Sequence, residues 1–430
     1  MTIILGVFIV LIFFIFLGVP IAFAIGLASL ASVFIFGIDI KLTLIPGQMF
    51  SGLDSFTLMA VPFFVTAGEV MNKSGITYKI IDLCDSVVGH LKSGLAYVNI
   101  LAAMILAGIS GSGTADAAAL GTTLIPNMEK KGYPREFAVA LTAAANTVGP
   151  IIPPSTLFII YAYYTGTSVA ALFLGGLLPG VIIGLSMMLL SYFICKAKGY
   201  GQETAKFNLK RFLQALYVGG VAFLIPVFIV ISIIKGFCTA TEAGVIIVAV
   251  SFALGYIYKT IRTWKDVYDV LYKSLMNTAG IFALLATSSI FANILARARF
   301  QQIVIQAVGG LTDSRILLML GIAFFISILG MFIDVAPMVI MFSACFCGIA
   351  VKAGISPIVF GVTFIVVCML GSITPPVGCL LFITTQISEL PMTRILKPIL
   401  PYILLYIVAV IFLLFFPGII TFIPNLVSLR

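Results

Sequence analysis

Residues 146–155 read NTVGPIIPPS, and this stretch limits how the surrounding chain can fold. One glycine and three prolines fall between Gly149 and Ser155, with apolar sequence on both sides. Proline has no N–H to donate and clashes with the preceding helical turn, so no ordinary helix runs through this stretch. We therefore predict a helix that is broken near its middle.

The rest of the chain has the composition of a membrane protein. Of its 430 residues, 62% are hydrophobic and 9% are charged, and the mean hydropathy is +1.24. In a soluble domain about a quarter of the residues are charged. Apolar runs long enough to span a bilayer recur from Ile3–Val19 to Ile399–Phe416, so we predict an all-α polytopic membrane protein. A helix break inside lipid must then be buried in protein or line a polar cavity.

Several other function classes find no support in the sequence. The chain has no GxGxxG or Walker sequence, so we expect no ATP site. The seven cysteines are scattered without matching His or Cys pairs, so we expect neither a zinc site nor disulfides. The net charge of +9 lies in loops and fits the positive-inside bias better than binding to nucleic acid.

The basic residues cluster in four loops, which the positive-inside rule places in the cytoplasm: 72–93, 128–136, 196–211 and 259–273. We expect the last loop, with its Trp, to lie along the membrane interface. Two of these loops enclose residues 94–126. As a helix this segment would be ~50 Å long, too long for one crossing and too short for two, which need ~60 Å. We predict a re-entrant hairpin with its tip near GISGSGTAD (108–116); two short tilted helices are the alternative.

The broken helix, predicted over 137–164, has a second copy. Residues 370–378 read LGSITPPVG, so Gly149-x3-Pro-Pro recurs as Gly371-x3-Pro-Pro at an offset of 222. A second hairpin is predicted over 311–351 and a second broken helix over 357–388, with Asp116 and Asp334 paired upstream at an offset of 218. The flanking charges of the two hairpins differ, so we expect them to enter from opposite faces, as in the inverted repeats of secondary transporters.

This repeat divides the chain into five predicted parts. They are N-terminal scaffold helices at 1–54, the first repeat at 55–212, a scaffold and interfacial segment at 213–273, the second repeat at 274–398, and a C-terminal helix at 399–430.

Unwound backbone inside a membrane exposes carbonyl oxygens, and the ends of half-helices carry partial charge. Carbonyl oxygens together with Ser, Thr and Asn oxygens suit Na⁺, and helix N-termini attract a carboxylate. We predict one Na⁺ site between each hairpin tip and its broken helix, with the carbonyls of Gly149 and Gly371 as candidate ligands. The candidate side-chain oxygens belong to Ser110, Ser112, Thr114, Asn146, Thr147 and Thr374.

Asp116 and Asp334 are carboxylates within apolar sequence, and such groups are functional candidates because a charge in lipid is costly. Each could cap or tie its own hairpin, since Asp readily bonds nearby N–H groups, or could gate an ion or substrate. Glu69 and Glu242 also lie in apolar sequence, where we expect structural partners near the ends of spans. The candidates for substrate contact or gating are Ser112, Thr114, Asp116, Asn146, Pro153, Asp334, Pro375 and Pro376.

Long stretches of the chain resemble a known family, the large membrane subunit of TRAP (tripartite ATP-independent periplasmic) transporters. The stretches are GVPIAFAIG (18–26), VPFFVTAGEVM (61–71), GISGSGTADAAALGTTLIPNMEKKGYPREFAVALTAAANTVGPIIPPS (108–155), GMFIDVAPMVIM (330–341) and GSITPPVG (371–378). The resemblance implies an elevator-type fold similar to the ion-transporter superfamily, and Na⁺-driven import across the bacterial inner membrane. It also implies two partners, a small four-helix membrane subunit and a soluble periplasmic substrate-binding protein.

Carried over by position, the resemblance implies two Na⁺ sites. They fall around Ser110, Gly149, Ile152 and Pro154, and around Gly330, Gly371, Thr374 and Val377. The implied substrates are organic anions of the C4-dicarboxylate, sialic acid or sugar acid class. A stand-alone Na⁺-coupled di- or tricarboxylate carrier is the alternative function, and a channel or membrane scaffold is a further one.

Overall fold

The structure is a computed structural model that describes residues 2–38, 40–201, 207–299, 302–303 and 314–427. Within these ranges the chain is helical and has no strand, in agreement with the predicted all-α class. Five of the described helices are long and apolar enough to cross a membrane: α10 (Val169–Lys198), α12 (Ala240–Ile257), α13 (Trp264–Arg297), α16 (Val335–Lys352) and α19 (Met392–Phe415).

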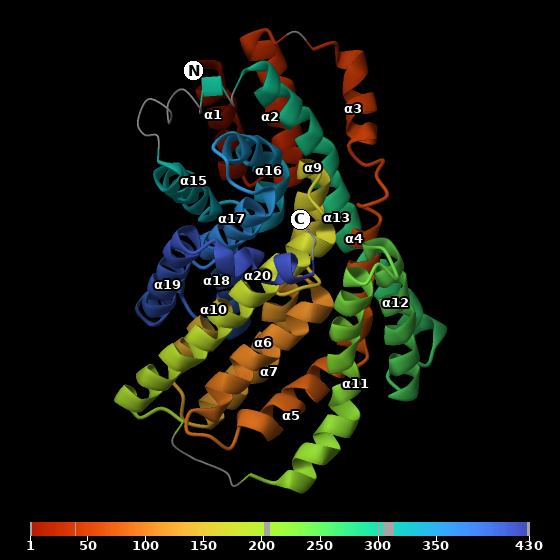
Figure 1. Ribbon diagram of the computed structural model, residues 1–430, viewed down its shortest axis with the longest axis vertical. Coiled ribbons are helices and arrows are strands. Elements are labelled where there is room, and N and C mark those ends of the chain that lie inside the picture. The colour runs from red at the N-terminus through yellow and green to blue at the C-terminus, as the bar shows by residue number, and fades with distance from the viewer. Residues whose placement is uncertain (1, 39, 202–206, 300–301, 304–313, 428–430) are drawn as a thin grey trace.

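The first predicted hairpin consists of α6 (Gly94–Ser110) and α7 (Gly113–Lys130), which pack together and are joined by a two-residue turn (Figure 1). Gly111 has a φ of +60°, a conformation that favours glycine. The Ser112 side chain accepts a hydrogen bond from the Ala115 N–H at 3.5 Å, which caps the start of α7. The helix runs through Pro126 and ends at Lys130, beyond the predicted end of the hairpin at 126.

The first predicted helix break lies between α8 (Arg135–Ala145) and α9 (Thr156–Thr165). A short 3-10 turn, Asn146–Val148, leads into the irregular residues 149–155. All ten residues of NTVGPIIPPS are buried. The break is therefore enclosed by protein, which is the condition under which irregular backbone survives at membrane depth.

The second unit repeats this order of elements. It consists of α15 (Arg315–Gly330), α16, α17 (Pro357–Ser372) and α18 (Cys379–Ser388), with the break at 373–378. Residues 311–313 of the predicted hairpin lie outside the described part of the chain. Helices α7 and α16 begin at positions 113 and 335 and end at 130 and 352, so both pairs of ends are 222 positions apart. The offset of the two Pro-Pro pairs thus extends to the hairpins.

The remaining helices surround these two units. They are α1 (Thr2–Phe16), α2 (Ile21–Phe36), η1 (Leu42–Leu44), α3 (Ile45–Ser51), α4 (Ala60–Lys73), α5 (Ile76–Val88), α11 (Leu209–Ile234) and α20 (Gly418–Leu426). Helix α13 packs against α2, α3 and α4, and α4 packs against α12 (Figure 1).

Two predicted boundaries fall inside helices. The division at 273/274 lies within α13, because a capping box formed by Thr263 and Asp266 already starts that helix at Trp264. The basic segment 264–273 is therefore the first part of a long helix. The division at 398/399 lies within α19, which contains Pro398 and Pro401 and is followed by the separate helix α20.

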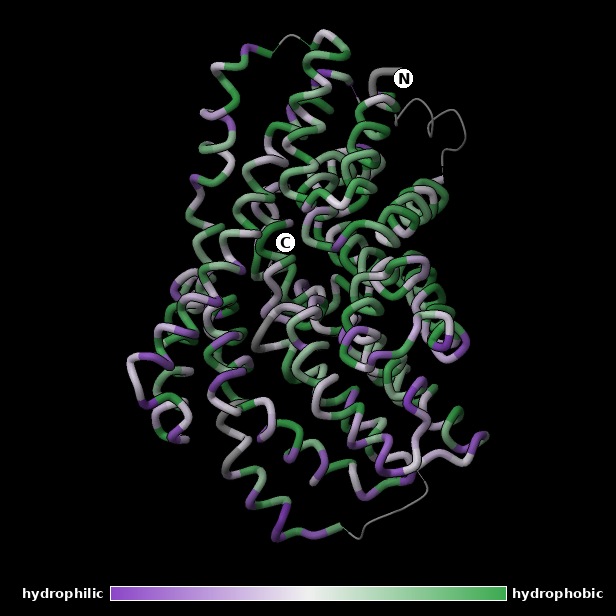
Figure 2. The backbone as a smooth tube through the Cα atoms, turned by 180° about the vertical axis from the view of Figure 1, so that it is seen from behind, coloured by the Kyte–Doolittle hydropathy of each residue, from purple (hydrophilic) through white to green (hydrophobic). Residues whose placement is uncertain are grey.

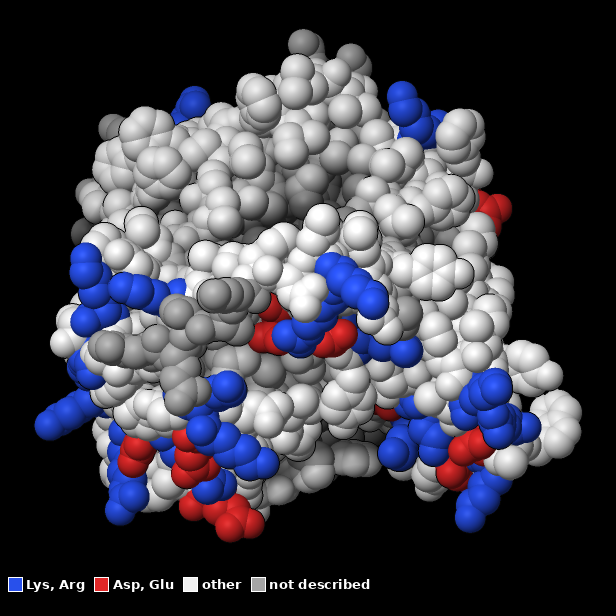
Figure 3. Space-filling model, turned by 90° about the horizontal axis from the view of Figure 1, so that it is seen from below, with Lys and Arg blue, Asp and Glu red and all other residues white. Residues whose placement is uncertain are grey.

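The four basic loops lie together at the lower end of the molecule in Figure 1, which Figure 3 shows from below. Hydrophilic residues gather toward this end, whereas hydrophobic sequence covers the helices above it (Figure 2). The contacts that join the loops are Ser93 N–H to Gly201 O (3.1 Å), Arg211 to Asp85 (2.6 Å), Lys73 to Asp266 (3.4 Å) and the packing of Tyr133 on Gly201. The four loops therefore lie near one another, and their placement in the cytoplasm stays a prediction.

Candidate functional site

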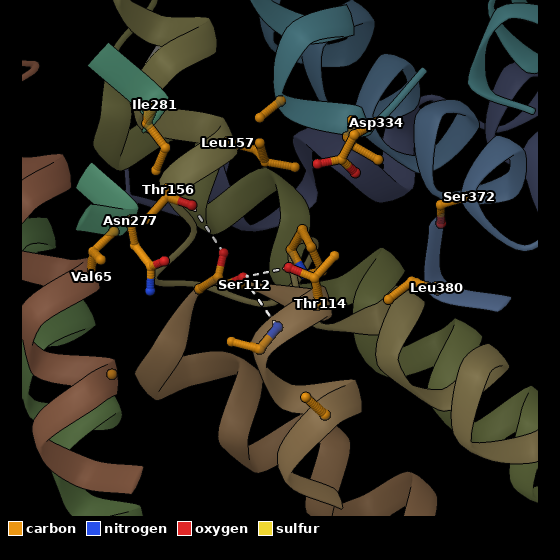
Figure 4. Close-up of a pocket in the computed structure, with 18 of the residues that line it drawn as sticks. Val65, Ser112, Thr114, Thr156, Leu157, Asn277, Ile281, Asp334, Ser372 and Leu380 are labelled. Carbon is orange, nitrogen blue, oxygen red and sulfur yellow. Dashed lines mark hydrogen bonds between the residues drawn. The ribbon is translucent and has the colours of Figure 1, made fainter. Parts of the chain in front are cut away.

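A cavity of about 540 Å³ lies where the two hairpin tips and the two helix breaks meet (Figure 4). Helices α4 and α13 contribute further residues to its wall. The first repeat contributes Gly111, Ser112, Gly113 and Thr114 of its tip and Pro150, Thr156 and Leu157 of its break. The second repeat contributes Asp334 and Val335 of its tip and Ser372 and Leu380 beside its break. Helices α4 and α13 contribute Glu69, Asn72 and Asn277.

The first hairpin tip rests directly on the backbone of the first break. Thr156 Oγ1 donates to the Gly111 carbonyl oxygen at 3.0 Å. A Cβ added to Gly113 would lie only 2.6 Å from the carbonyl oxygen of Asn146. Glycine is the residue that permits such a close backbone approach, which explains why the SGSG sequence occurs at this tip.

The Asn146 side chain carries a buried oxygen beside the first break, although Asn146 does not belong to the cavity lining. Its Nδ2 donates to the Thr142 carbonyl oxygen at 2.7 Å, whereas its Oδ1 is buried and has no hydrogen-bond partner among the described residues. Buried polar atoms normally have a partner, and a missing ion is one reason for an exception. Amide and carbonyl oxygens have the chemistry that hard cations prefer. The buried amide oxygen of Asn146 and the backbone carbonyls of the first break therefore have the chemistry to hold a small cation such as Na⁺.

Both helices that leave the first tip and the first break begin at the cavity. Ser112 caps α7 and also lies 3.1 Å from Thr114 Oγ1. Ser155 caps α9 by accepting a hydrogen bond from the Phe158 N–H at 3.4 Å. The N-terminus of a helix carries a partial positive charge and free N–H groups, which favour an anion nearby.

The second tip makes the same kind of contact with the second break. A Cβ added to Gly371 would lie 2.6 Å from the Cα of Gly330, and the reverse addition would give 3.0 Å. The Gly378 N–H donates to the Met331 carbonyl oxygen at 3.1 Å, and Gly378 has a φ of +50°. Two backbones thus touch without intervening side chains, as at the first tip.

Asp334 occupies the N-cap position of α16, but its side chain does not bond the N–H groups that an N-cap residue usually caps. Its carboxylate is directed toward the cavity (Figure 4). The carboxylate hydrogen-bonds instead with the Val335 N–H of its own hairpin and with Cys379 beside the second break. A tie within the hairpin and a role in gating both stay predictions. The structural counterpart of Asp334 in the first unit is Ser112, because these two N-cap residues are 222 positions apart.

The predicted pairing of Asp116 with Asp334 is accordingly incorrect. Asp116 lies in the first turn of α7, four positions after the N-cap residue Ser112, and is 1% exposed. It does not belong to the lining of the cavity. The two residues were matched by their acidic character, although they occupy different positions in their helices.

The residues implied for the first Na⁺ site are only partly brought together. Gly149 lies beside the first tip, since a Cβ there would be 3.4 Å from the Gly113 Cα, and the Pro154 carbonyl oxygen faces Gly111. The Ile152 side chain packs instead on Gly180 of α10. Ser110 is the last residue of α6, and its side chain lies outside the described part of the structure.

At the second implied site, Gly330 and Gly371 are in contact, but Thr374 and Val377 are placed differently. Thr374 Oγ1 donates to the Leu370 carbonyl oxygen at 2.6 Å, so this hydroxyl closes the end of α17. The Val377 side chain is 42% exposed.

The other candidate residues of the two breaks have distinct surroundings. Thr147 Oγ1 donates to the Ala144 carbonyl oxygen, and the Pro153 carbonyl oxygen faces Gly108 of the first hairpin. Pro375 is half-buried and Pro376 is exposed, and neither belongs to the cavity lining.

Three polar residues of the cavity wall were not predicted as part of the site. Glu69 and Asn72 of α4 lie opposite the tips, and Asn277 of α13 donates its Nδ2 to Glu69 Oε1 at 2.9 Å. These partners are 208 positions apart, so no local motif connects them. The signal available in the sequence was the presence of polar side chains within apolar helices, which often marks a functional position. Glu242, in contrast, caps α12 together with Thr239, as expected of a structural partner.

The charge of the cavity is unusual for an anion site. None of the described lining residues is Lys, Arg or His, whereas Glu69 and Asp334 are both acidic. Positive potential in the cavity must therefore come from the helix N-termini at both tips and breaks, or from a bound cation. This arrangement can hold an anion and a cation together.

The fold resembles solved membrane transporters. The structure of the Alcanivorax borkumensis YdaH transporter aligns with a TM-score of 0.64 at 12% sequence identity, covering 87% of this chain and 88% of that one. MtrF of Neisseria gonorrhoeae aligns with a TM-score of 0.60 at 12% identity, over 87% of this chain and 83% of that one. This likeness shows that the chain shares the overall fold of these two membrane proteins.

Residues 8–419 match the family model described as "Tripartite ATP-independent periplasmic transporter, DctM component". The chain is 36% identical to the uncharacterised protein YgiK of Salmonella typhimurium, over 95% of this chain and 94% of that protein. It is 32% identical to the sialic acid TRAP transporter large permease protein SiaM of Vibrio cholerae, over 96% of each. It is 34% identical to the 2,3-diketo-L-gulonate TRAP transporter large permease protein YiaN of Escherichia coli, over 96% and 95%. The chain belongs to the large permease family of the TRAP transporters.

Proposed function

We propose that this protein is the permease subunit of a Na⁺-coupled transporter that imports an organic anion across the bacterial inner membrane. The observation that carries the proposal is the cavity between the two tips and the two breaks, which offers helix N-termini and oxygen ligands but no basic side chain among its described residues. An anion entering this space meets the carboxylates of Glu69 and Asp334. Bound Na⁺ would offset that repulsion, which makes binding of the two solutes mutually dependent.

The proposed Na⁺ positions lie between each hairpin tip and its break. At the first, the residues that would hold the ion are Asn146, through its buried Oδ1, and the carbonyls around Gly149. At the second, the closely packed backbones of Gly330 and Gly371 and the carboxylate of Asp334 are the nearest counterparts. Na⁺ supplies positive charge to the cavity, and the chain's own residues orient both solutes.

We further propose an elevator movement built on an inverted repeat. The cavity lies between a unit formed by the tips and breaks and a wall formed by α4 and α13. In Figure 1 the hairpin of α6 and α7 approaches the centre from below, whereas α15 and α16 lie above it. Sliding of the unit that contains both tips and both breaks along the wall of α4 and α13 would carry the bound solutes from one face of the membrane to the other.

The relatives support a proposed substrate class and proposed partners. The related permeases are named for sialic acid and for 2,3-diketo-L-gulonate, which both combine a carboxylate with several hydrogen-bonding groups. The polar lining of Glu69, Asn72 and Asn277 suits hydroxyl and carbonyl groups of such a substrate. We propose that a periplasmic binding protein delivers it and that a small four-helix membrane subunit completes the permease.

The experiment that tests this proposal is reconstitution in proteoliposomes with and without the two partners, using a panel of carboxylates that includes sialic acid, a sugar acid and a C4-dicarboxylate. We expect accumulation of one class only when the binding protein, the small subunit and an inward Na⁺ gradient are all present. Accumulation by this chain alone would favour a stand-alone Na⁺-coupled carboxylate carrier. Flux that ignores the Na⁺ gradient would favour a channel.

A further inference from the structure

A second cavity, of about 590 Å³, lies on the basic face and is separate from the first. It is formed by the start of α8, the last turns of α10 and the start of α19. Its polar residues are Glu136, Lys198, Arg394 and Lys397, and its apolar residues include Phe193 and Pro401.

The polar end of this groove is positively charged. Three basic side chains face one acidic side chain, and the ion pair between Arg394 and Glu136 is long, at 3.8 Å. Among the described residues, Lys397 has no acidic side chain within ion-pair distance. This end of the groove therefore has two more basic than acidic side chains. Its net positive charge complements the negatively charged phosphate of an anionic phospholipid.

The other end of the groove continues as two exposed apolar helix faces. On α10, Phe193, Leu189 and Leu185 follow one another at intervals of four residues and are 57%, 58% and 56% exposed. On α19, the face of Lys397 and Pro401 continues through Leu404 and Val408, which are 54% and 65% exposed.

Both faces run away from the basic end, because α10 ends there and α19 begins there. From Phe193 to Leu185 the rise is ~12 Å, comparable with the ~15 Å hydrocarbon depth of one leaflet.

We propose that this groove binds an anionic phospholipid of the cytoplasmic leaflet. The headgroup phosphate lies against Lys198, Arg394 and Lys397, and the two acyl chains follow the apolar faces of α10 and α19. A free phosphate ion would explain the basic end but not the two apolar faces that continue from it. Basic pockets between spanning helices on the cytoplasmic side have the chemistry of anionic headgroup sites, and the membrane supplies this ligand at high local concentration.

The site can be tested by native mass spectrometry of the full chain, purified alone and together with the small membrane subunit. The probes are dioleoyl phosphatidylglycerol, dioleoyl phosphatidylcholine and inorganic phosphate. The variant is the triple change Lys198→Gln, Arg394→Gln and Lys397→Gln. Each basic residue near the membrane surface contributes about fivefold to anionic lipid binding, so we expect the triple variant to bind phosphatidylglycerol on the order of 100-fold more weakly.

The matched control removes the same charge from the same face but outside the groove. Its changes are Lys210→Gln, Lys265→Gln and Lys273→Gln, at exposed positions of α11 and α13. We expect this control to bind phosphatidylglycerol like the wild type. Equal losses in both triple variants would mean that only the general surface charge attracts the lipid, and would overturn the proposal.

The remaining outcomes distinguish the possible occupants. Equal binding of phosphatidylglycerol and phosphatidylcholine would contradict an anionic site, and displacement of the lipid by millimolar phosphate would indicate a free-ion site. Loss of the lipid preference when the small subunit is bound would indicate that the partner covers the groove.

A photoactivatable phosphatidylglycerol with its reactive group on an acyl chain provides a readout that does not depend on a variant. We expect it to label peptides that contain Phe193 or Leu404. Labelling confined to other helices would overturn the assignment.

Discussion

The substitution Gly371→Ala tests whether the contact between the second tip and the second break must be this close. The added Cβ would lie 2.6 Å from the Cα of Gly330 and 2.8 Å from its carbonyl carbon, whereas ordinary contacts are 3.4–4 Å. Both neighbours are backbone atoms, so no side chain can rotate away. The hairpin and the break must separate by on the order of 1 Å, and close-packed interiors resist such a shift.

The expected stability change is moderate. Overpacking of this kind costs about 1–3 kcal/mol, and the better helix propensity of Ala over Gly near the end of α17 returns up to about 1 kcal/mol. We therefore expect a net loss between zero and about 3 kcal/mol in thermal unfolding. The geometry of an ion site tolerates only about 0.2 Å, so we expect stabilisation by Na⁺ and Na⁺-dependent uptake to fall more than tenfold.

The matched control is Gly321→Ala in α15 of the same hairpin. Gly321 is also helical, but an added Cβ there would meet no atom within 4 Å. We expect wild-type uptake and unchanged or slightly raised stability, because Ala favours the helix. The assay compares thermal unfolding in Na⁺ and in choline, together with the Na⁺ dependence of uptake in proteoliposomes. Wild-type Na⁺ dependence in Gly371→Ala would refute the proposal that the close backbone contact shapes an ion site.

Three further substitutions, two of them with a matched control, test the site and the packing between the two repeats. Ser112→Ala removes the α7 cap and a cavity hydroxyl, whereas Ser168→Ala removes only the cap of α10. Each substitution should cost about 1 kcal/mol in thermal unfolding. Only Ser112→Ala should change the apparent affinity for substrate. Identical uptake kinetics in the two variants would remove Ser112 from the site. Tyr161→Phe loses the 2.8 Å hydrogen bond to the Pro357 carbonyl oxygen and should cost about 1–2 kcal/mol. Tyr164→Phe in the same helix should be neutral, because that hydroxyl is buried without a partner among the described residues; equal losses would contradict this. Asp334→Asn keeps the side-chain shape but removes a charge that faces the cavity, and it should raise the Na⁺ concentration for half-maximal uptake about tenfold, which corresponds to 1.4 kcal/mol. An unchanged Na⁺ titration would show that the Asp334 carboxylate does not contribute to ion binding.

The breaks and tips were predictable because backbone chemistry dictates them. Pro153 and Pro154 cannot continue a helix, and the recurrence of a Pro-Pro pair at 375–376 is enough to locate the second break. The glycines of the SGSG tip indicated a close backbone approach, which the contact between Gly113 and Asn146 bears out.

The correspondence of individual side chains between the repeats was less predictable. Pairing Asp116 with Asp334 by residue type overlooked the helix register, in which Ser112 is the counterpart at the shared offset of 222. A site position can change from a hydroxyl to a carboxylate while the helix start stays in place. The repeat is therefore better aligned by helix ends than by chemically similar residues.

The wall opposite the tips could not be assembled from sequence. Glu69 and Asn277 meet only because α4 packs against α13, and no local pattern encodes that contact. Helix α13 itself was divided into a loop and a span, because the basic residues around Trp264 suggested a surface segment. The capping box at Thr263 and Asp266 is the local signal that identifies the helix start.

The central claim, that Na⁺ binding between the tips and the breaks drives uptake of an organic anion, is tested most directly by ion replacement. The complete transporter is reconstituted with its small subunit and loaded binding protein, and accumulation of substrate is measured at fixed pH with external Na⁺ or with choline. We predict accumulation against a gradient with Na⁺ and none with choline. Equal accumulation in the two salts would contradict the claim.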